Sequence, residues 1–154
     1  MSVTVSNIAF TASATPESCG GACDGSVTTT SPTGGTSPYT WSWSNGCTSQ
    51  TCGSLCPGTY TVTVTDSNSC LTTATVNITQ PTALVLTISE VAANCGSSDG
   101  EASVSVTGGV APYTYLWAPG GETTDTITGL FAGIYTVTVT DSNGCVDSAF
   151  ALIN

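Results

Sequence analysis

The stretch GTYTVTVTDSNSC at residues 58–70 returns almost unchanged as GIYTVTVTDSNGC at residues 133–145. In both copies Tyr and Val alternate with Thr, which is the pattern of a β-strand with one buried side and one solvent side. The Asp-Ser-Asn sequence that follows favours a tight turn. The duplicated stretch therefore predicts an antiparallel strand and a turn in each half of the chain.

The duplication extends outward and predicts the fold of each half. Residues 34–70 align with residues 108–145, and Gly-rich and Asp-Gly turn sequences separate short alternating segments. About seven short strands per half at this spacing indicate a β-sandwich. The expected fold class is all-β: two tandem immunoglobulin-like antiparallel β-sandwich domains with disulfides. The aromatic residues expected on the core side are Tyr39, Trp41, Trp43, Tyr113, Tyr115 and Trp117.

The sequence before two of the tyrosines supports the immunoglobulin-like interpretation. Residues 55–60 (LCPGTY) and 130–135 (LFAGIY) look like a tyrosine corner. In that feature a Tyr near the start of a late strand donates a hydrogen bond back to the preceding loop. We expect Trp43 and Trp117 to take the place of the core Trp of such domains.

The alignment of the halves predicts three segments along the chain. Pro81 cannot donate to a strand ladder, so it marks the boundary between a first domain at 9–80 and a second at 81–154. Residues 1–8 are left over and resemble a strand with no place in the first domain. We expect this segment to add to a sheet of another subunit as a donor strand; the alternative is an extended or frayed end. The residues expected to be buried at that junction are Val3, Val5, Ile8 and Phe10.

The composition excludes several classes of function. The 154 residues include no Lys, Arg or His and ten Asp and Glu, which gives a formal net charge of −10. Binding to nucleic acid and to anionic membrane surfaces requires basic side chains and is not expected, and no apolar run is long enough for membrane insertion. Nucleophilic catalysis usually needs a His base, so we expect neither an enzyme nor a cofactor.

Eight cysteines in a small chain indicate disulfides and an oxidising compartment. The second half has only Cys95 and Cys145, which predicts a bridge between them, and Cys19–Cys70 is the equivalent pair in the first half. Cys23, Cys47, Cys52 and Cys56 then allow three pairings, of which Cys47–Cys52 with Cys23–Cys56 is one, and an intermolecular bridge is another alternative. The spacings Cys19-x-x-x-Cys23 and Cys52-x-x-x-Cys56 come nearest to a zinc site, but no His is present and we expect no metal.

Three further kinds of site remain as candidates. Asp24, Asp66, Asp99 and Asp141 recur in both halves, either as weak calcium ligands or, in the interpretation we favour, as residues that cap turns. Trp41 and Tyr115 would be the contacts of a glycan-binding face if they were exposed, although their spacing favours the core. Asn77, in Asn-Ile-Thr, is a glycosylation candidate.

The combined pattern resembles a known repeat. It consists of CGGACDGS at 19–26, Gly-Gly-x-x-Pro-Tyr-x-x-x-Trp-Ser-Asn-Gly at 34–46, Leu-x-x-Gly-Thr-Tyr-Thr-Val-Thr-Val-Thr-Asp at 55–66, and Cys70. This pattern is similar to the SprB repeat, which recurs in giant surface adhesins of gliding bacteria and in secreted proteins of that lineage. The resemblance implies an extracellular or cell-surface location, an immunoglobulin-like sandwich, and a role in adhesion or surface structure.

Together these observations predict an extracellular structural protein. We expect a subunit of a self-assembling filament, at the cell surface or secreted, that is stabilised by disulfides and by strand addition between subunits. Its main partner would be another copy of the chain, joined head to tail, with glycans as a candidate partner. The alternative is an adhesin binding module, cut from a longer repeat protein, that contacts a glycan or another surface.

Overall fold

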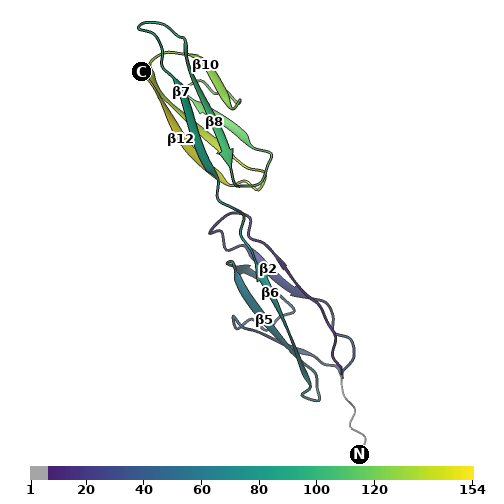
Figure 1. Ribbon diagram of the computed structural model, residues 1–154. Helices are drawn as coiled ribbons and strands as arrows, with labels where there is room; N and C mark the ends of the chain where they lie inside the picture. The colour runs from purple at the N-terminus through teal and green to yellow at the C-terminus, as the bar shows by residue number, and fades with distance from the viewer. Residues whose placement is uncertain (1–6) are drawn as a thin grey trace, which may run out of the picture. The chain divides into compact units, whose positions relative to one another are not determined.

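The computed structural model describes residues 7–154, and every helix or strand assigned in that range is a β-strand. The chain divides into two compact units, Met1–Gln80 (unit 1) and Pro81–Asn154 (unit 2). Figure 1 shows strands in both units. The expectation of an all-β, antiparallel fold is confirmed.

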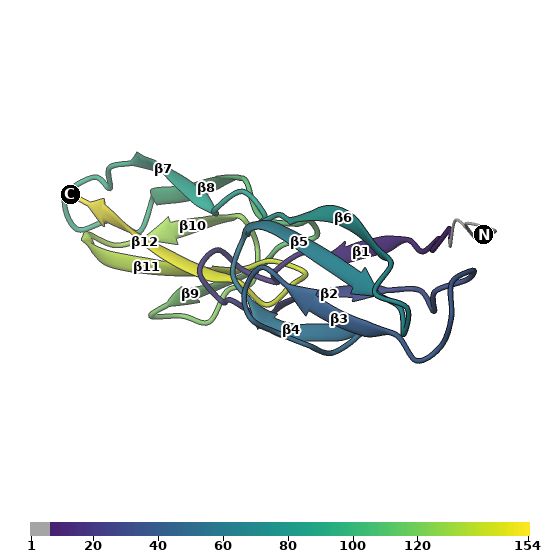
Figure 2. The same ribbon diagram turned by 90° about the horizontal axis from the view of Figure 1, so that it is seen from below.

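Unit 1 consists of two antiparallel three-stranded sheets, ordered β1-β2-β4 and β3-β5-β6. The alternation expected in the duplicated stretch is present in β5, where Val62 and Val64 are buried. The strands are β1 (Ala12–Thr15), β2 (Gly25–Thr29), β3 (Thr40–Trp43), β4 (Thr51–Leu55), β5 (Gly58–Thr65) and β6 (Leu71–Ile78), and Figure 2 labels all of them.

Unit 2 repeats this arrangement with sheets ordered β7-β8-β10 and β9-β11-β12. In β11 the buried residues are Val137 and Val139, which correspond to the two valines of β5. The strands are β7 (Val85–Val91), β8 (Gly100–Thr107), β9 (Thr114–Ala118), β10 (Thr126–Leu130), β11 (Gly133–Thr140) and β12 (Val146–Ile153).

Over the described residues 7–154, each unit is an immunoglobulin-like sandwich with six strands rather than the seven expected. The first, second and fourth strands form one sheet, and the third, fifth and sixth form the other. Between the third and fourth strands, residues 44–50 of unit 1 cross from one sheet to the other and form no strand.

The tyrosine corner and the core Trp are confirmed in both units. The Tyr60 hydroxyl donates to the Cys56 carbonyl at 2.9 Å, and the Tyr135 hydroxyl donates to the Phe131 carbonyl at 3.2 Å. Trp43 and Trp117 are buried in their own cores. Each indole N–H donates to a backbone carbonyl of the crossover that follows, so the buried donor is satisfied.

The direction of the strands defines two ends for each unit. In unit 1 the last strand, β6, runs towards the linker, and Glu17 N–H beyond β1 donates to the Thr79 carbonyl there. In unit 2 the last strand runs away from the linker, and Ala93 N–H beyond β7 donates to the Asn154 carbonyl. We call the end of each unit nearest the linker its linker end and the opposite end its distal end.

The first prediction concerns close packing at the start of β2. A Cβ atom on Gly25 would lie 2.8 Å from Ile78 Cγ2 and 3.0 Å from the Leu55 carbonyl oxygen. Gly25→Ala is therefore expected to destabilise unit 1 by about 1–3 kcal/mol in denaturant unfolding, because it overpacks the core. Gly53→Ala is the matched control, since a methyl group at Gly53 would have no atom within 4 Å. Equal stability of the two variants would contradict this packing.

Candidate assembly site

The described part of the N-terminal segment packs on its own unit, which corrects the donor-strand expectation at Ile8 and Phe10. Ala9 and Thr33 exchange two backbone hydrogen bonds of 2.9 Å, so the segment begins a strand pairing inside unit 1. Ile8 is buried in the unit 1 core and Phe10 packs against that core. The prediction that Ile8 and Phe10 are buried in another subunit is therefore wrong. Val3 and Val5 lie outside the described residues.

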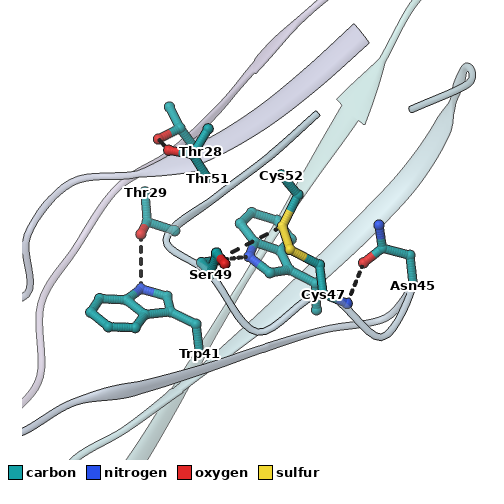
Figure 3. Close-up of a disulfide and its surroundings, with 9 residues drawn as sticks. Thr28, Thr29, Trp41, Asn45, Cys47, Ser49, Thr51 and Cys52 are labelled. Carbon is teal, nitrogen blue, oxygen red and sulfur yellow. Dashed lines mark hydrogen bonds between the residues drawn. A yellow bond between two sulfur atoms is a disulfide. The ribbon is translucent and has the colours of Figure 1, made fainter. Parts of the chain in front are cut away.

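Two disulfides reinforce unit 1. Cys23–Cys56 ties the loop between β1 and β2 to the turn between β4 and β5, at the linker end. Cys47–Cys52 joins the crossover to β4, and Figure 3 shows this bridge. Ser49 lies between these two cysteines, and its carbonyl accepts the Trp43 indole N–H at 3.0 Å. The crossover bridge therefore holds the acceptor of the core Trp in place.

The two bridges predicted within the halves, Cys19–Cys70 and Cys95–Cys145, are wrong. Cys70 and Cys95 carry free thiols, whereas Cys19 and Cys145 are disulfide-bonded. The reason is strand length. The eight residues of β6 separate the ends at which Cys19 and Cys70 lie, and those of β12 separate Cys95 from Cys145. Eight strand residues span about 25 Å, whereas a disulfide needs Cα atoms about 4–7 Å apart.

An aspartate carboxylate organises the turn between the last two strands of each unit. Asp66 Oδ1 accepts the N–H groups of Asn68 and Cys70 at 2.9 Å, and its Oδ2 accepts Thr36 N–H at 3.0 Å. Asp141 makes the equivalent bonds with Asn143, Cys145 and Val110, each 2.9 Å long. These carboxylates hold backbone donors, as the turn-capping interpretation requires.

A second pair of aspartates holds the loops that carry Cys19 and Cys95. Asp24 accepts the backbone N–H of Ser18 at 2.8 Å and also its hydroxyl. Asp99 accepts the backbone N–H of Asn94 at 2.8 Å and also its side-chain amide. Across residues 7–154, no group of three or more Cys, Asp and Glu side chains is arranged to hold a metal ion.

These hydrogen bonds lower the pKa values of three aspartates. The Ser18 hydroxyl and N–H lower the pKa of Asp24, and the Asn94 N–H and amide lower the pKa of Asp99. Removal from water alone would raise the pKa of Asp141, but its backbone N–H donors outweigh that effect and the pKa is lowered. All three groups are therefore more acidic in the folded protein than in the unfolded chain.

The aromatic candidates for a glycan-binding face belong to the cores. Trp41 and Tyr115 are half-buried and pack against the core clusters of their units. The Trp41 indole N–H donates to the Thr29 hydroxyl at 2.9 Å (Figure 3). Burial raises the pKa of the Tyr115 phenol, and the nearby Asp125 charge adds to this. Both side chains therefore contribute to core packing, as their spacing favours.

The outer face of the β3-β5-β6 sheet in unit 1 is largely polar. Thr61 and Thr75 lie opposite each other with hydroxyl oxygens 3.2 Å apart, and the Thr59 hydroxyl donates to Asn77 Oδ1 at 2.7 Å. Asn77, the glycosylation candidate, is exposed on this face. Leu71 is the large apolar exception, at the start of β6.

The corresponding face of unit 2 is apolar, and the sequence pattern did not reveal it. Ile134 and Leu152 are directly opposite in the β11–β12 ladder, and Phe150 lies on the same face of β12. The repeat places Thr59, Asn77 and Thr75 at these three positions in unit 1. A comparison of the differences between the halves, rather than of their similarities, would have found it. The apolar face consists of Leu116 (54% exposed), Ile134 (63%), Phe150 (67%) and Leu152 (44%).

Comparison with protein families supports the resemblance. The model of the SprB repeat matches residues 11–48 and residues 92–122, one stretch in each unit. The matched stretches contain the loops of Cys19 and Cys95 and the core residues Trp43 and Trp117. No curated protein matches the chain. Within residues 7–154 no helix is suited to span a membrane.

Among solved structures, the chain is similar to a crystallised C-terminal 282-residue fragment of intimin in complex with the intimin-binding domain of the translocated intimin receptor. The identity is 16% and the TM-score 0.43, and the match covers 96% of this chain. The chain spans 64% of that fragment's length.

The second prediction concerns the turn before Cys70. Ser69 adopts a left-handed conformation with φ of 67°, and Gly144 occupies the equivalent position with φ of 84°. Because a Cβ atom is disfavoured there, Ser69→Gly is expected to stabilise unit 1 by about 0.5–1 kcal/mol in denaturant unfolding. Gly144→Ser should destabilise unit 2 by a similar amount. A loss of stability in Ser69→Gly would contradict the turn conformation.

The third prediction concerns acid stability. Because the pKa values of Asp24, Asp99 and Asp141 are lowered in the folded protein, their ionised carboxylates stabilise the fold at any pH above the usual Asp pKa of 3.8. This stabilisation is lost as the pH falls through the folded-state pKa values. The melting temperature should therefore fall as pH is lowered from about 5 to about 2. Asp141→Asn should melt lower than the parent at neutral pH but lose less on acidification. An equal acid-induced drop in the parent and the variant would contradict the role of Asp141.

Proposed function

We propose that the chain is an extracellular structural module that assembles with copies of itself through the apolar face of unit 2. The observation that carries this proposal is the exposure of Ile134, Phe150 and Leu152 on a sheet whose counterpart in unit 1 is polar. Fully burying an aliphatic or aromatic side chain of this size contributes about 1.5–3 kcal/mol. A contiguous exposed group of such residues is typical of an interaction surface.

A second copy of the chain is the occupant that we propose, and the charge distribution limits the surfaces at which two copies can meet. The chain has ten acidic side chains and no basic ones, so no ion pair between side chains can form across an interface of two copies. Two copies must therefore meet through uncharged surfaces. The outward positions of β9, β11 and β12 carry Thr, Ala, Ser, Leu, Ile, Val and Phe, with no ionisable residue among them. Local repulsion does not oppose contact between two such faces.

An extracellular location fits the covalent structure. Cys23–Cys56 and Cys47–Cys52 are bridges of the kind that persist in oxidising compartments. The SprB repeat match in each unit supports a surface protein built from repeated modules. In this proposal the module serves as a spacer or a filament subunit and has no catalytic role.

The alternative function is a binding module of a longer surface adhesin. The SprB repeat matches favour it, because such repeats occur in adhesins. The same apolar face would then contact a foreign surface or ligand instead of a second copy. The two functions differ in whether the purified chain associates with itself.

The fourth prediction exchanges the apolar face for its unit 1 counterpart. Phe150→Thr with Leu152→Asn introduces the residues found at Thr75 and Asn77. Self-association, measured by analytical ultracentrifugation and electron microscopy, should weaken at least about tenfold, because two apolar side chains no longer become buried.

The matched control is Leu71→Thr, which removes an apolar side chain with 65% exposure from unit 1. This control should leave self-association unchanged and retain the parent melting temperature. A monomeric parent chain across the concentration range would reject self-assembly and favour the adhesin module. Equal loss in both variants would show that general surface hydrophobicity, rather than the apolar face, drives association.

A further inference from the structure

Four cysteines occupy two equivalent kinds of position in the units. Cys19 and Cys95 follow the first strand of their units, so Cys19 lies at the linker end of unit 1 and Cys95 at the distal end of unit 2. Cys70 and Cys145 precede the last strand, so Cys70 lies at the distal end of unit 1 and Cys145 at the linker end of unit 2. Each distal end therefore carries one of these cysteines, and so does each linker end.

The local frame of each distal cysteine matches that of its linker-end counterpart. Cys70 and Cys145 both donate their N–H to an aspartate Oδ1 at 2.9 Å, and each carbonyl accepts the N–H of that same aspartate. In the other pair, the residue before Cys19 and the residue before Cys95 are each held by an aspartate through two hydrogen bonds. The frames are therefore alike, although the oxidation states differ.

The linker-end cysteines show that a cysteine in either of these local frames can form a disulfide. Cys19 and Cys145 are disulfide-bonded, whereas Cys70 and Cys95 carry thiols. Cys95 is exposed and Cys70 is half-buried. Cys70 cannot reach Cys19 at the other end of unit 1, and Cys95 cannot reach Cys145 at the other end of unit 2. In each case a strand of eight residues separates the two cysteines.

We propose that Cys95 of one copy forms a disulfide with Cys70 of the next copy, which links the chains head to tail. The inference rests on the proposed function, because the copies must first associate. Each chain offers one thiol of each kind, so the contact uses two different surfaces and adds chains without limit. The apolar face and the disulfide are then two separate contacts between copies, one non-covalent and one covalent.

The chemistry requires a disulfide oxidant, either a protein dithiol oxidase or a small disulfide such as oxidised glutathione. The thiolate of one cysteine attacks the oxidant's sulfur and forms a mixed disulfide, with release of one thiol. The second thiolate then attacks the protein sulfur of that mixed disulfide and releases the second thiol. The two cysteines lose two electrons and two protons in total, and the oxidant is reduced to two thiols.

The fifth prediction tests this link with single variants of the full chain. Treated with oxidised glutathione, the parent should form a ladder of covalent multimers on non-reducing gels. Cys70→Ser and Cys95→Ser should each remain monomeric on their own. An equal mixture of the two should form a covalent dimer and no larger species. One variant supplies only the Cys95 thiol and the other only the Cys70 thiol, so the dimer has no thiol left to extend it. Peptide mass spectrometry after cleavage at acidic residues should identify the Cys95–Cys70 bond in that dimer.

Three outcomes would overturn the inference. The first is a parent that stays monomeric with both thiols still reactive to iodoacetamide. The second is a monomer in which neither thiol reacts, which would indicate a bridge within one chain. The third is homodimers in either single variant that are as abundant as dimers in the mixture. Parent-like melting temperatures of both variants serve as the folding control.

The double variant Cys70→Ser with Cys95→Ser separates this inference from the proposed function. If the double variant still self-associates in the ultracentrifuge while the parent forms no covalent ladder, the disulfide link is wrong and the proposed function stands. If the parent forms no association of any kind, the proposed function fails. A ladder that persists in Phe150→Thr with Leu152→Asn would retain the link and reject the apolar face as the main contact.

Discussion

Each unit depends on one aspartate carboxylate that accepts backbone N–H groups from two chain segments at once. Asp66 and Asp141 hold both the turn between the last two strands and the loop that leads into the third strand. Because the third strand carries the core Trp, this carboxylate helps to align Trp43 or Trp117 between the sheets. The same bonds fix the backbone of Cys70 and Cys145. Core packing and cysteine position therefore depend on one side chain in each unit.

Because the chain has no basic side chains, its carboxylates can be held only by hydrogen bonds and not by ion pairs with other side chains. Ten acidic groups have no Lys, Arg or His to pair with. The structure holds several of them with N–H and O–H donors, and Glu17, which is buried, accepts the N–H groups of Gly21 and Cys23. These acids serve local loops. Side-chain ion pairs between two copies of the chain cannot form, because neither copy has a basic side chain.

Local pattern predicted the elements of the fold but not the relations between distant segments. Alternation of Val and Thr is sufficient to predict β5 and β11, because the period of a strand is visible within eight residues. The pairing of Cys47 with Cys52 and of Cys23 with Cys56 is confirmed. The pairs Cys19–Cys70 and Cys95–Cys145 were wrong because equal positions in the two halves do not reveal at which end of a strand each cysteine lies. The sequence around Ile8 predicts a buried strand residue, but it does not show whether Ile8 is buried in its own unit or in another subunit. The apolar face was not predicted because it lies at positions where the two halves differ, whereas the alignment of the repeat uses the positions where they agree.

The parallel course of the first and last strands has a mechanical consequence. The chain enters each unit at one end and leaves it at the other, as the bonds of Glu17 to Thr79 and of Ala93 to Asn154 show. Tension applied to the chain therefore acts along the strands, so that the hydrogen bonds of a ladder are loaded together in shear rather than broken one after another. In unit 1 the Cys23–Cys56 bridge also prevents the segment between these residues from being drawn out. A tether built from such units would resist pulling with little extension, and its unit 1 would lengthen less than the same number of unconstrained residues.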